Sequence, residues 1–146
     1  MQNCADYIIL LNLKFRITMR FLVVDDSFTI RRIFFYALQT FGIEDIIEAE
    51  DGSEAINKLR TSNVDFIITD WSMPVMSGLE MTKVIRSDEK LKNLPILMVT
   101  TRGFKQDIID GLQARVNNYI VKPFTPDILK EKIYNIMNKT TLEGLN

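Results

Sequence analysis

Reactive polar side chains end or follow four of the five apolar stretches in this 146-residue chain. Asp25 and Asp26 come after the first stretch, Asp70 after the third, Thr100 after the fourth and Lys122 after the fifth. Adjacent carboxylates at the edge of an apolar core repel each other and resist desolvation, and a bound cation would relieve that cost. Mg²⁺ takes hard oxygen ligands and usually serves phosphates. A hydroxyl and an ammonium suit a phosphoryl group, and an aspartate can attack phosphorus. These residues therefore predict a magnesium and phosphoryl site, provided that the fold brings them together.

The elements that would position these side chains alternate between strands and helices. Continuous apolar runs predict five buried strands, at 21–24, 46–47, 66–69, 96–99 and 119–121. Apolar residues at helical spacing predict a helix after each strand. The first helix is expected to face the core through Ile30, Ile33, Phe34, Ala37, Leu38 and Phe41, and the fourth through Ile108, Ile109 and Leu112. Ser77 and Thr125 are expected N-caps, Pro126 a first helical residue and Gly42 a helix stop.

This alternation predicts a single α/β domain with one parallel sheet covered by helices on both faces. Ligands of such sheets bind beyond the carboxyl ends of the strands, at a topological switch point, which is where the reactive residues lie. We expect the domain to span 19–139. Residues 1–18 are expected to be an N-terminal extension that is non-native or disordered, and 140–146 a polar tail.

Composition narrows the function. The net charge is −1, so no basic field indicates a nucleic-acid partner. The chain has no histidine, which excludes histidine bases, ligands and phosphohistidine chemistry on this chain. A lone cysteine, Cys4, cannot form an internal disulfide, which favours a reducing, cytoplasmic compartment. The apolar run at 7–11 is far shorter than the roughly 20 residues that span a bilayer, so no membrane partner is expected.

Five motifs together carry a specific resemblance: FLVVDDSFTIRRI, EAEDG, DWSMPVMSGLE, PILMVTT and NNYIVKPFT. They resemble the receiver domains of bacterial two-component response regulators over about 19–139. The DW-MP and YIVKPFT stretches resemble the single-domain chemotaxis branch in particular. The resemblance implies a flavodoxin-like, doubly wound (βα)5 fold, with a five-stranded parallel sheet in the order 2-1-3-4-5.

The resemblance also implies the ligands of a metal. By it, Asp70 is the phosphoacceptor. Asp26, Asp70 and the backbone carbonyl of Ser72 bind Mg²⁺ directly, and Asp25 helps through a water molecule.

Three further roles follow from the resemblance. Thr100 binds a phosphoryl oxygen, and Lys122 contacts both the carboxylate and the phosphoryl group. Tyr119 matches an aromatic switch that turns inward when Thr100 moves toward the phosphate. The Lys122-Pro123 peptide bond is expected to be cis.

The function implied is that of a monomeric signalling protein that catalyses only its own phosphorylation and dephosphorylation. A chemotaxis histidine kinase would phosphorylate it, the flagellar motor switch would bind the phosphorylated form, and a phosphatase would be a further partner. Two alternatives stay open: a phosphorelay intermediate that passes its phosphoryl group to a histidine phosphotransfer protein, and, less favoured, an aspartate-nucleophile phosphatase. The latter usually needs a second carboxylate two residues after the nucleophile, where this chain has Ser72.

Some positions depart from the family pattern. Arg115 and Val116 stand where Gly-Ala is common, so we expect either Asn117 or Asn118 to take the left-handed conformation, or the helix end to be reshaped. Beyond Thr100, Thr101 is bulkier than the usual Ala or Gly and is expected to restrict access to Asp70. Arg102 is expected to add a charge near the mouth of the site.

Overall fold

The computed structural model describes residues 19–101 and 105–143, with the side chains of 140–143 left out. The expected extension at 1–18, Arg102 and the end of the tail at 144–146 lie outside the described residues. Strands and helices alternate strictly, as predicted. The elements are β1 (Arg20–Val24), α2 (Phe28–Thr40), β2 (Asp45–Ala49), α3 (Gly52–Thr61), β3 (Phe66–Asp70), α4 (Gly78–Ser87), β4 (Ile96–Thr100), α5 (Lys105–Gln113), β5 (Asn118–Val121) and α6 (Pro126–Glu143).

The five strands form one parallel sheet in the order β2-β1-β3-β4-β5, which confirms the flavodoxin-like topology. The strand order reverses at β1, so the switch point lies between β1 and β3. Asp25 lies beside Asp70, because the residues before them are Cα partners. Pairing of β4 with β3 and β5 brings Thr100 and Lys122 to the same end of the sheet, where the strands have their carboxyl ends. Register therefore collects the reactive residues at one end of the sheet.

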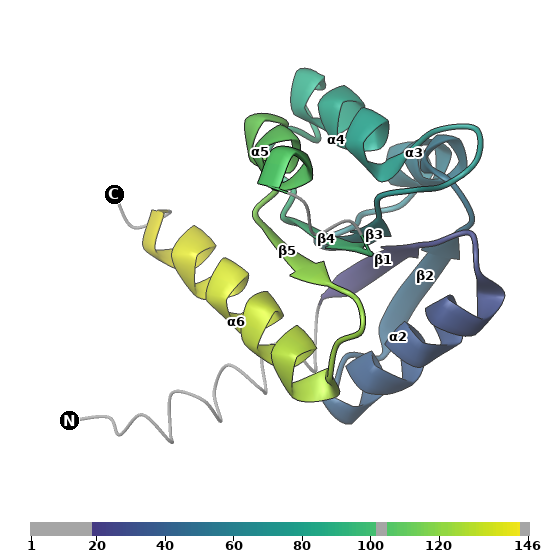
Figure 1. The fold of residues 1–146 in the computed structure, drawn as a ribbon, viewed down its shortest axis with the longest axis vertical. Coiled ribbons are helices and arrows are strands. Elements are labelled where there is room, and N and C mark those ends of the chain that lie inside the picture. Colours follow the sequence, from purple (N-terminus) through teal and green to yellow (C-terminus); the bar gives the residue numbers. More distant parts are fainter. Residues whose placement is uncertain (1–18, 102–104, 144–146) are drawn as a thin grey trace.

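Helices cover both faces of the sheet, with α2 and α6 on one face and α3, α4 and α5 on the other (Figure 1). Two buried apolar clusters match these layers. The α2/α6 cluster includes Phe21, Phe34, Leu38, Phe66, Leu97, Leu129 and Ile133. The opposite cluster includes Leu22, Ala55, Ile56, Ile67, Trp71, Met81 and Ile85. Burial on both sides explains why β1, β3 and β4 are almost continuously apolar.

The predicted helix signals are present. The Ser77 hydroxyl accepts from the Glu80 N–H at 3.1 Å, and the Thr125 hydroxyl accepts from the Ile128 N–H at 3.2 Å. Gly42, after the end of α2, has the positive φ of 85° expected of a helix stop. The last helix continues past the expected domain end at 139, to Glu143. Among the described helices, none combines the length and apolar character needed to cross a membrane.

The predicted apolar face of α2 is wrong at one flank. Ile33 is 50% exposed, whereas Phe34 is buried and Arg31 is only 6% exposed. Ile33 lies about 100° around the helix from Phe34, which turns it out of the narrow stripe that contacts the sheet. Leu112 of α5 is likewise 54% exposed, against the prediction that it faces the core. Apolar spacing alone overestimates the width of a helix's buried stripe.

Candidate functional site

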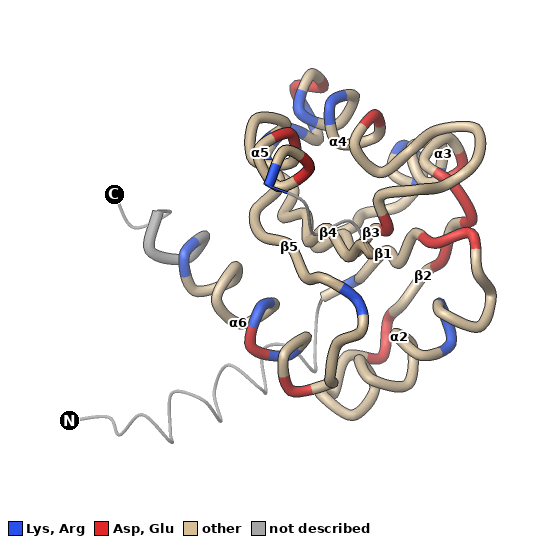
Figure 2. The backbone as a smooth tube through the Cα atoms, viewed as in Figure 1, with Lys and Arg blue, Asp and Glu red and all other residues tan. Residues whose placement is uncertain are grey.

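Three carboxylates meet at the carboxyl ends of β1 and β3. Asp25, Asp26 and Asp70 each offer an oxygen, and these oxygens all lie within 4.8 Å of one another. Figure 2 shows acidic residues gathered where these strands end beside α3. Asp25 is buried, Asp70 is partly buried and Asp26 is exposed. The structure therefore brings the predicted acidic residues into one cluster with a solvent-facing side.

Asp25 is held through both its backbone and its side chain. Its N–H donates to the Ala49 carbonyl at 3.1 Å, and its Oδ1 accepts from the Ser27 N–H at 2.9 Å. Its Oδ2 accepts from the Lys122 ammonium at 3.2 Å. Buried charges are tolerated when they are paired and hydrogen-bonded in this way. The Asp25 carboxylate therefore has little freedom to move.

The Lys122 ammonium lies between two of the carboxylates. Its Nζ is 3.2 Å from Asp25 Oδ2 and 3.6 Å from Asp70 Oδ1. Burial is the main reason that the pKa of Asp70 is raised, and the Asp25 charge raises it further, while Lys122 and the Trp71 N–H oppose the shift. The Trp71 N–H donates to Asp70 Oδ1 at 2.9 Å. Lys122 and the Trp71 N–H thus offset only part of the cost of burying the ionised Asp70 carboxylate.

The donor set fits a magnesium ion. Three carboxylates face one ammonium, and their oxygens are close enough for a single cation to lie among them. The excess negative charge is what a divalent cation would neutralise, and the ligands are the hard oxygens that Mg²⁺ prefers. The exposed Asp26 lines a hollow together with Ser72, which leaves space for water molecules, as Mg²⁺ usually requires.

The loop after β3, residues 71–77, borders the site beside Asp26 and is closed by a hydrogen bond between its two ends. The Gly78 N–H donates to the Trp71 carbonyl at 2.8 Å. A Cβ atom on Gly78 would lie 2.1 Å from the Asp70 carbonyl oxygen, so no larger residue fits without a backbone shift. This close approach fixes where the 71–77 loop crosses the mouth of the site.

The same loop contains a strained residue that no sequence pattern indicated. Val75 has a φ of 66°, and the Met76 N–H donates to the Pro74 carbonyl at 2.7 Å across it. This arrangement is a γ-turn of the positive-φ type, which is rare and strained. The Val75 side chain is 82% exposed, so apolar burial does not offset the strain.

We expect Val75→Asn to raise the free energy of unfolding by about 1 kcal/mol, because asparagine adopts a positive φ more readily than a β-branched residue does. Val75→Ala is the matched control, since it removes the β-branching but lacks the amide that bonds to the nearby backbone in asparagine, and it should recover less. Chemical denaturation of the metal-free protein measures both variants. Equal stability of Val75→Asn and wild type would show that the turn stores no strain.

The predicted switch residues line one small cavity between the sheet and α5. Thr100 is buried and Tyr119 is partly exposed. Both border this cavity with Trp71, Ile108 and Gly111. The structure therefore places the two predicted switch residues beside the same cavity.

The peptide bond between Lys122 and Pro123 is cis, as expected. The Lys122 N–H donates to the Thr100 carbonyl at 2.8 Å, which ties the two loops beyond β4 and β5. Thr101 is exposed, and its expected effect on access to Asp70 stays a prediction.

The expectation for the end of α5 is wrong. Arg115 itself adopts the left-handed conformation, with a φ of 68°, and neither Asn117 nor Asn118 does so. The Arg86 guanidinium donates to the Arg115 carbonyl at 3.0 Å and to Asn117 Oδ1 at 3.0 Å, which supports the unusual turn from α4. Asn117 Oδ1 also accepts from the Ile96 N–H at 2.8 Å, so this side chain ties the turn to the start of β4. Contacts between distant segments thus replace the glycine.

Sequence reasoning also missed Arg31, a buried cation next to the site. Its Nη1 donates to the Asp25 carbonyl at 2.7 Å. The only sequence signal was its place one turn into the helix that follows the acidic pair, and arginine in such a position usually faces solvent.

Comparison with known proteins gives a consistent result. The response regulator receiver domain model matches residues 21–134. The chain is 50% identical over 127 residues to a CheY homolog of Campylobacter jejuni, covering 86% of this chain and 98% of that protein. It is 53% identical over 116 residues to CheY1 of Helicobacter pylori, covering 79% and 94%. The structure of TrrA from Thermotoga maritima, in complex with Mg²⁺ and BeF, superposes with a TM-score of 0.72 at 38% identity, covering 82% and 99%.

Proposed function

The chain belongs to the response regulator receiver domain family, and from that premise we propose that it is a single-domain chemotaxis response regulator. A histidine kinase phosphorylates Asp70, and the phosphorylated form binds the flagellar motor switch. The observation that carries this proposal is the group of three carboxylates around Asp70, with the Lys122 ammonium between two of them. The chemotaxis role is supported by the relatives, which are CheY proteins. Such a carrier would diffuse in the cytoplasm as a monomer.

Mg²⁺ is the cofactor that we propose for this site. Asp26, Asp70 and the Ser72 carbonyl would hold the ion, and Asp25 would help through a water molecule. When bound, it would neutralise charge on the phosphoryl oxygens during transfer. The related TrrA protein forms a complex with Mg²⁺ and BeF, a phosphoryl mimic. That complex supports the proposal that a cation and a phosphoryl group bind together at this site.

The protein's own residues orient the transfer. An Asp70 carboxylate oxygen attacks the phosphorus of a phosphohistidine on the kinase, the P–N bond breaks, and its electron pair stays on the imidazole nitrogen. The Trp71 N–H, 2.9 Å from Asp70 Oδ1, holds one carboxylate oxygen in place. Lys122 supplies positive charge beside the developing acyl phosphate, and the Thr100 hydroxyl donates to a phosphoryl oxygen. Beyond its own phosphorylation and dephosphorylation, the domain catalyses no reaction under this proposal.

Two binding experiments separate a chemotaxis output from a relay output. Labelled chemotaxis kinase is first used to phosphorylate the protein in the presence of Mg²⁺. The product is then offered to an N-terminal peptide of the motor switch and, separately, to a histidine phosphotransfer domain. We expect phosphorylation-dependent peptide binding and no transfer. Transfer of label to the phosphotransfer domain without peptide binding would instead identify a phosphorelay intermediate.

Asp26→Ala should weaken Mg²⁺ binding by at least about tenfold, a loss that even outer partners of metal sites produce. Trp71 borders the same hollow as Asp26, so its fluorescence can report the titration. Removing one carboxylate also relieves repulsion, so the metal-free variant should unfold at a higher temperature than wild type. An unchanged titration midpoint would mean that the acidic pair does not hold the metal.

A further inference from the structure

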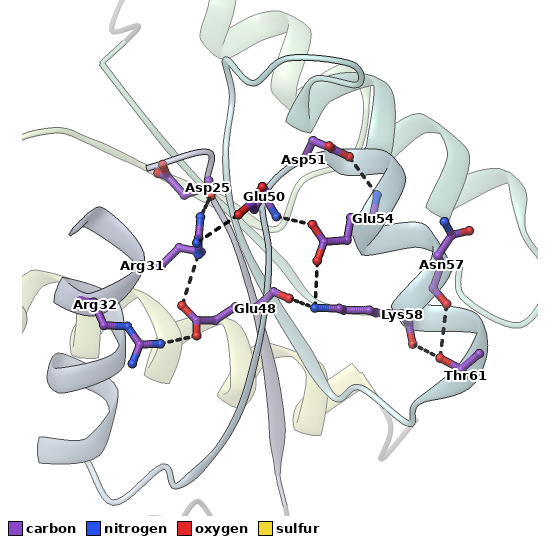
Figure 3. Close-up of polar contacts among 10 residues, drawn as sticks. All are labelled: Asp25, Arg31, Arg32, Glu48, Glu50, Asp51, Glu54, Asn57, Lys58 and Thr61. Atoms are coloured by element: carbon purple, nitrogen blue, oxygen red, sulfur yellow. Dashed lines mark hydrogen bonds and ion pairs between the residues drawn. The ribbon is translucent and has the colours of Figure 1, made fainter. Parts of the chain in front are cut away.

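Arg31 of α2 connects the acidic loop, which carries Asp25 and Asp26, to strand β2. Its guanidinium points away from solvent, and the side chain is 8% exposed. Nη1 donates to the Asp25 carbonyl at 2.7 Å, Nε donates to Glu48 Oε1 at 3.2 Å, and Nη2 lies 3.7 Å from Glu50 Oε1 (Figure 3). Burying a guanidinium is costly unless it is paired, so these contacts define a single position for the group.

The acceptor of the shortest of these bonds is the carbonyl of the peptide that joins Asp25 to Asp26. A peptide unit is planar, so fixing its carbonyl oxygen also fixes the N–H of Asp26 and the direction in which the chain continues. The Asp25 side chain is already held by Ser27 and Lys122. Arg31 therefore adds a direct bond to the backbone of the acidic pair, at the peptide that leads to the exposed carboxylate of Asp26.

Glu48 in turn fixes Arg31. One of its carboxylate oxygens accepts from Arg31 Nε, and the other accepts from Arg32 Nη2. Its backbone carbonyl accepts from the Lys58 ammonium of α3, and Lys58 also pairs with Glu54 at 3.0 Å (Figure 3). The network thus ties the acidic loop to α2, β2 and α3, next to the site that we propose for Mg²⁺.

We propose that Arg31 is a positioning residue of the metal site, which orients the Asp25–Asp26 peptide so that the Asp26 carboxylate faces the ion, with Glu48 holding the guanidinium in place. This inference rests on the proposed function, because it concerns affinity for Mg²⁺. It assigns metal affinity to a side chain that never touches the ion. Partners of this kind typically change metal affinity about 10–100-fold when they are mutated.

The test is a Mg²⁺ titration of the full chain, followed by Trp71 fluorescence well below the unfolding temperature. Arg31→Lys keeps the charge but cannot contact the Asp25 carbonyl and Glu48 together, so its midpoint should rise by about tenfold. Arg20→Lys is the matched control, because it makes the same change at an arginine that pairs with another carboxylate of β2, Asp45, outside the network around Glu48, and it should leave the midpoint unchanged. Glu48 touches no atom of the acidic pair, and Glu48→Gln should also weaken Mg²⁺ binding, because it weakens the bond that holds Arg31. If Arg31→Lys does not fold, Glu48→Gln serves as the test variant in its place.

A double-mutant cycle separates positioning from a general loss of structure. If Arg31 acts through Asp26, Arg31→Lys should have no further effect on the midpoint in the Asp26→Ala background. Additive shifts in the cycle, or a midpoint of Arg31→Lys equal to that of wild type, would overturn this inference alone. A wild-type protein whose Trp71 fluorescence and thermal midpoint do not respond to Mg²⁺ would overturn the proposed metal function and this inference with it.

Discussion

Replacing Asp70 with asparagine should abolish labelling of the protein by a phosphorylated chemotaxis kinase and by acetyl phosphate. The amide of asparagine is a poor nucleophile and carries no charge for a cation to bind, so both the attacking atom and one proposed metal ligand are lost. Asp127→Asn is a suitable control, because Asp127 is an exposed carboxylate at the start of α6 and is not part of the acidic cluster. That variant should be labelled at the wild-type rate. Full labelling of Asp70→Asn would assign the nucleophile to another residue.

The same substitution should make the metal-free domain more stable at neutral pH. Burial is the largest cause of the raised pKa of Asp70, so the folded protein holds a proton on this group at a higher pH than the unfolded chain does. Between the two pKa values the folded state binds more protons, and stability therefore falls as the pH rises through this window. Above it, the ionised carboxylate opposes folding, and asparagine removes that opposition. Thermal unfolding without Mg²⁺ should show a higher midpoint for Asp70→Asn at pH 7 and a smaller difference at pH 4.

Thr100→Val should leave phosphorylation intact but abolish the rise in partner affinity that phosphorylation causes. Valine keeps the volume of this buried side chain and removes its hydroxyl donor. A phosphoryl group on Asp70 would then gain no hydrogen bond that draws residue 100 toward the site, and Tyr119 would have no vacated space to enter. A ligand shifts a conformational equilibrium only by its differential affinity for the two states.

The measurement is the affinity of a motor-switch peptide with and without beryllofluoride, in wild type and Thr100→Val. Couplings of this kind are about 1–3 kcal/mol, or about 5–150-fold in affinity, and the variant should lose most of that ratio. Thr101→Val is the matched control, because it removes a hydroxyl from the neighbouring, exposed residue. If Thr100→Val keeps the full wild-type increase, the signal leaves the site by a route other than this hydroxyl.

The sheet and the acidic cluster were predictable because local patterns determine them. Strands buried on both faces are continuously apolar, and parallel strands end at one edge, so the positions of Asp25, Asp70, Thr100 and Lys122 followed from the alternation of elements. Capping by Ser77 depends on residues close to it in the chain, and it was predicted for that reason.

The features that were missed depend on contacts between distant segments. A buried arginine has no local signature, and the burial of Arg31 in α2 depends on its pairing with Glu48 of β2. The left-handed conformation of Arg115 is supported by Arg86 from α4, and no residue near Arg115 indicates it. The turn at Val75 lies in the loop between β3 and α4, whose path is constrained by the close approach of Gly78 to the Asp70 carbonyl. Such pairings are set by tertiary structure, which a single sequence does not display.

The most direct test of the central proposal is to locate the phosphoryl group on the chain itself. The protein is phosphorylated by a chemotaxis kinase with Mg²⁺ and then reduced with borohydride, which converts an aspartyl phosphate to homoserine. Peptide mass spectrometry then identifies the reduced residue. The proposal predicts homoserine at position 70 and at no other aspartate, and no homoserine when Mg²⁺ is removed with a chelator. Homoserine at another position, or none at all in a protein that has taken up label, would contradict it.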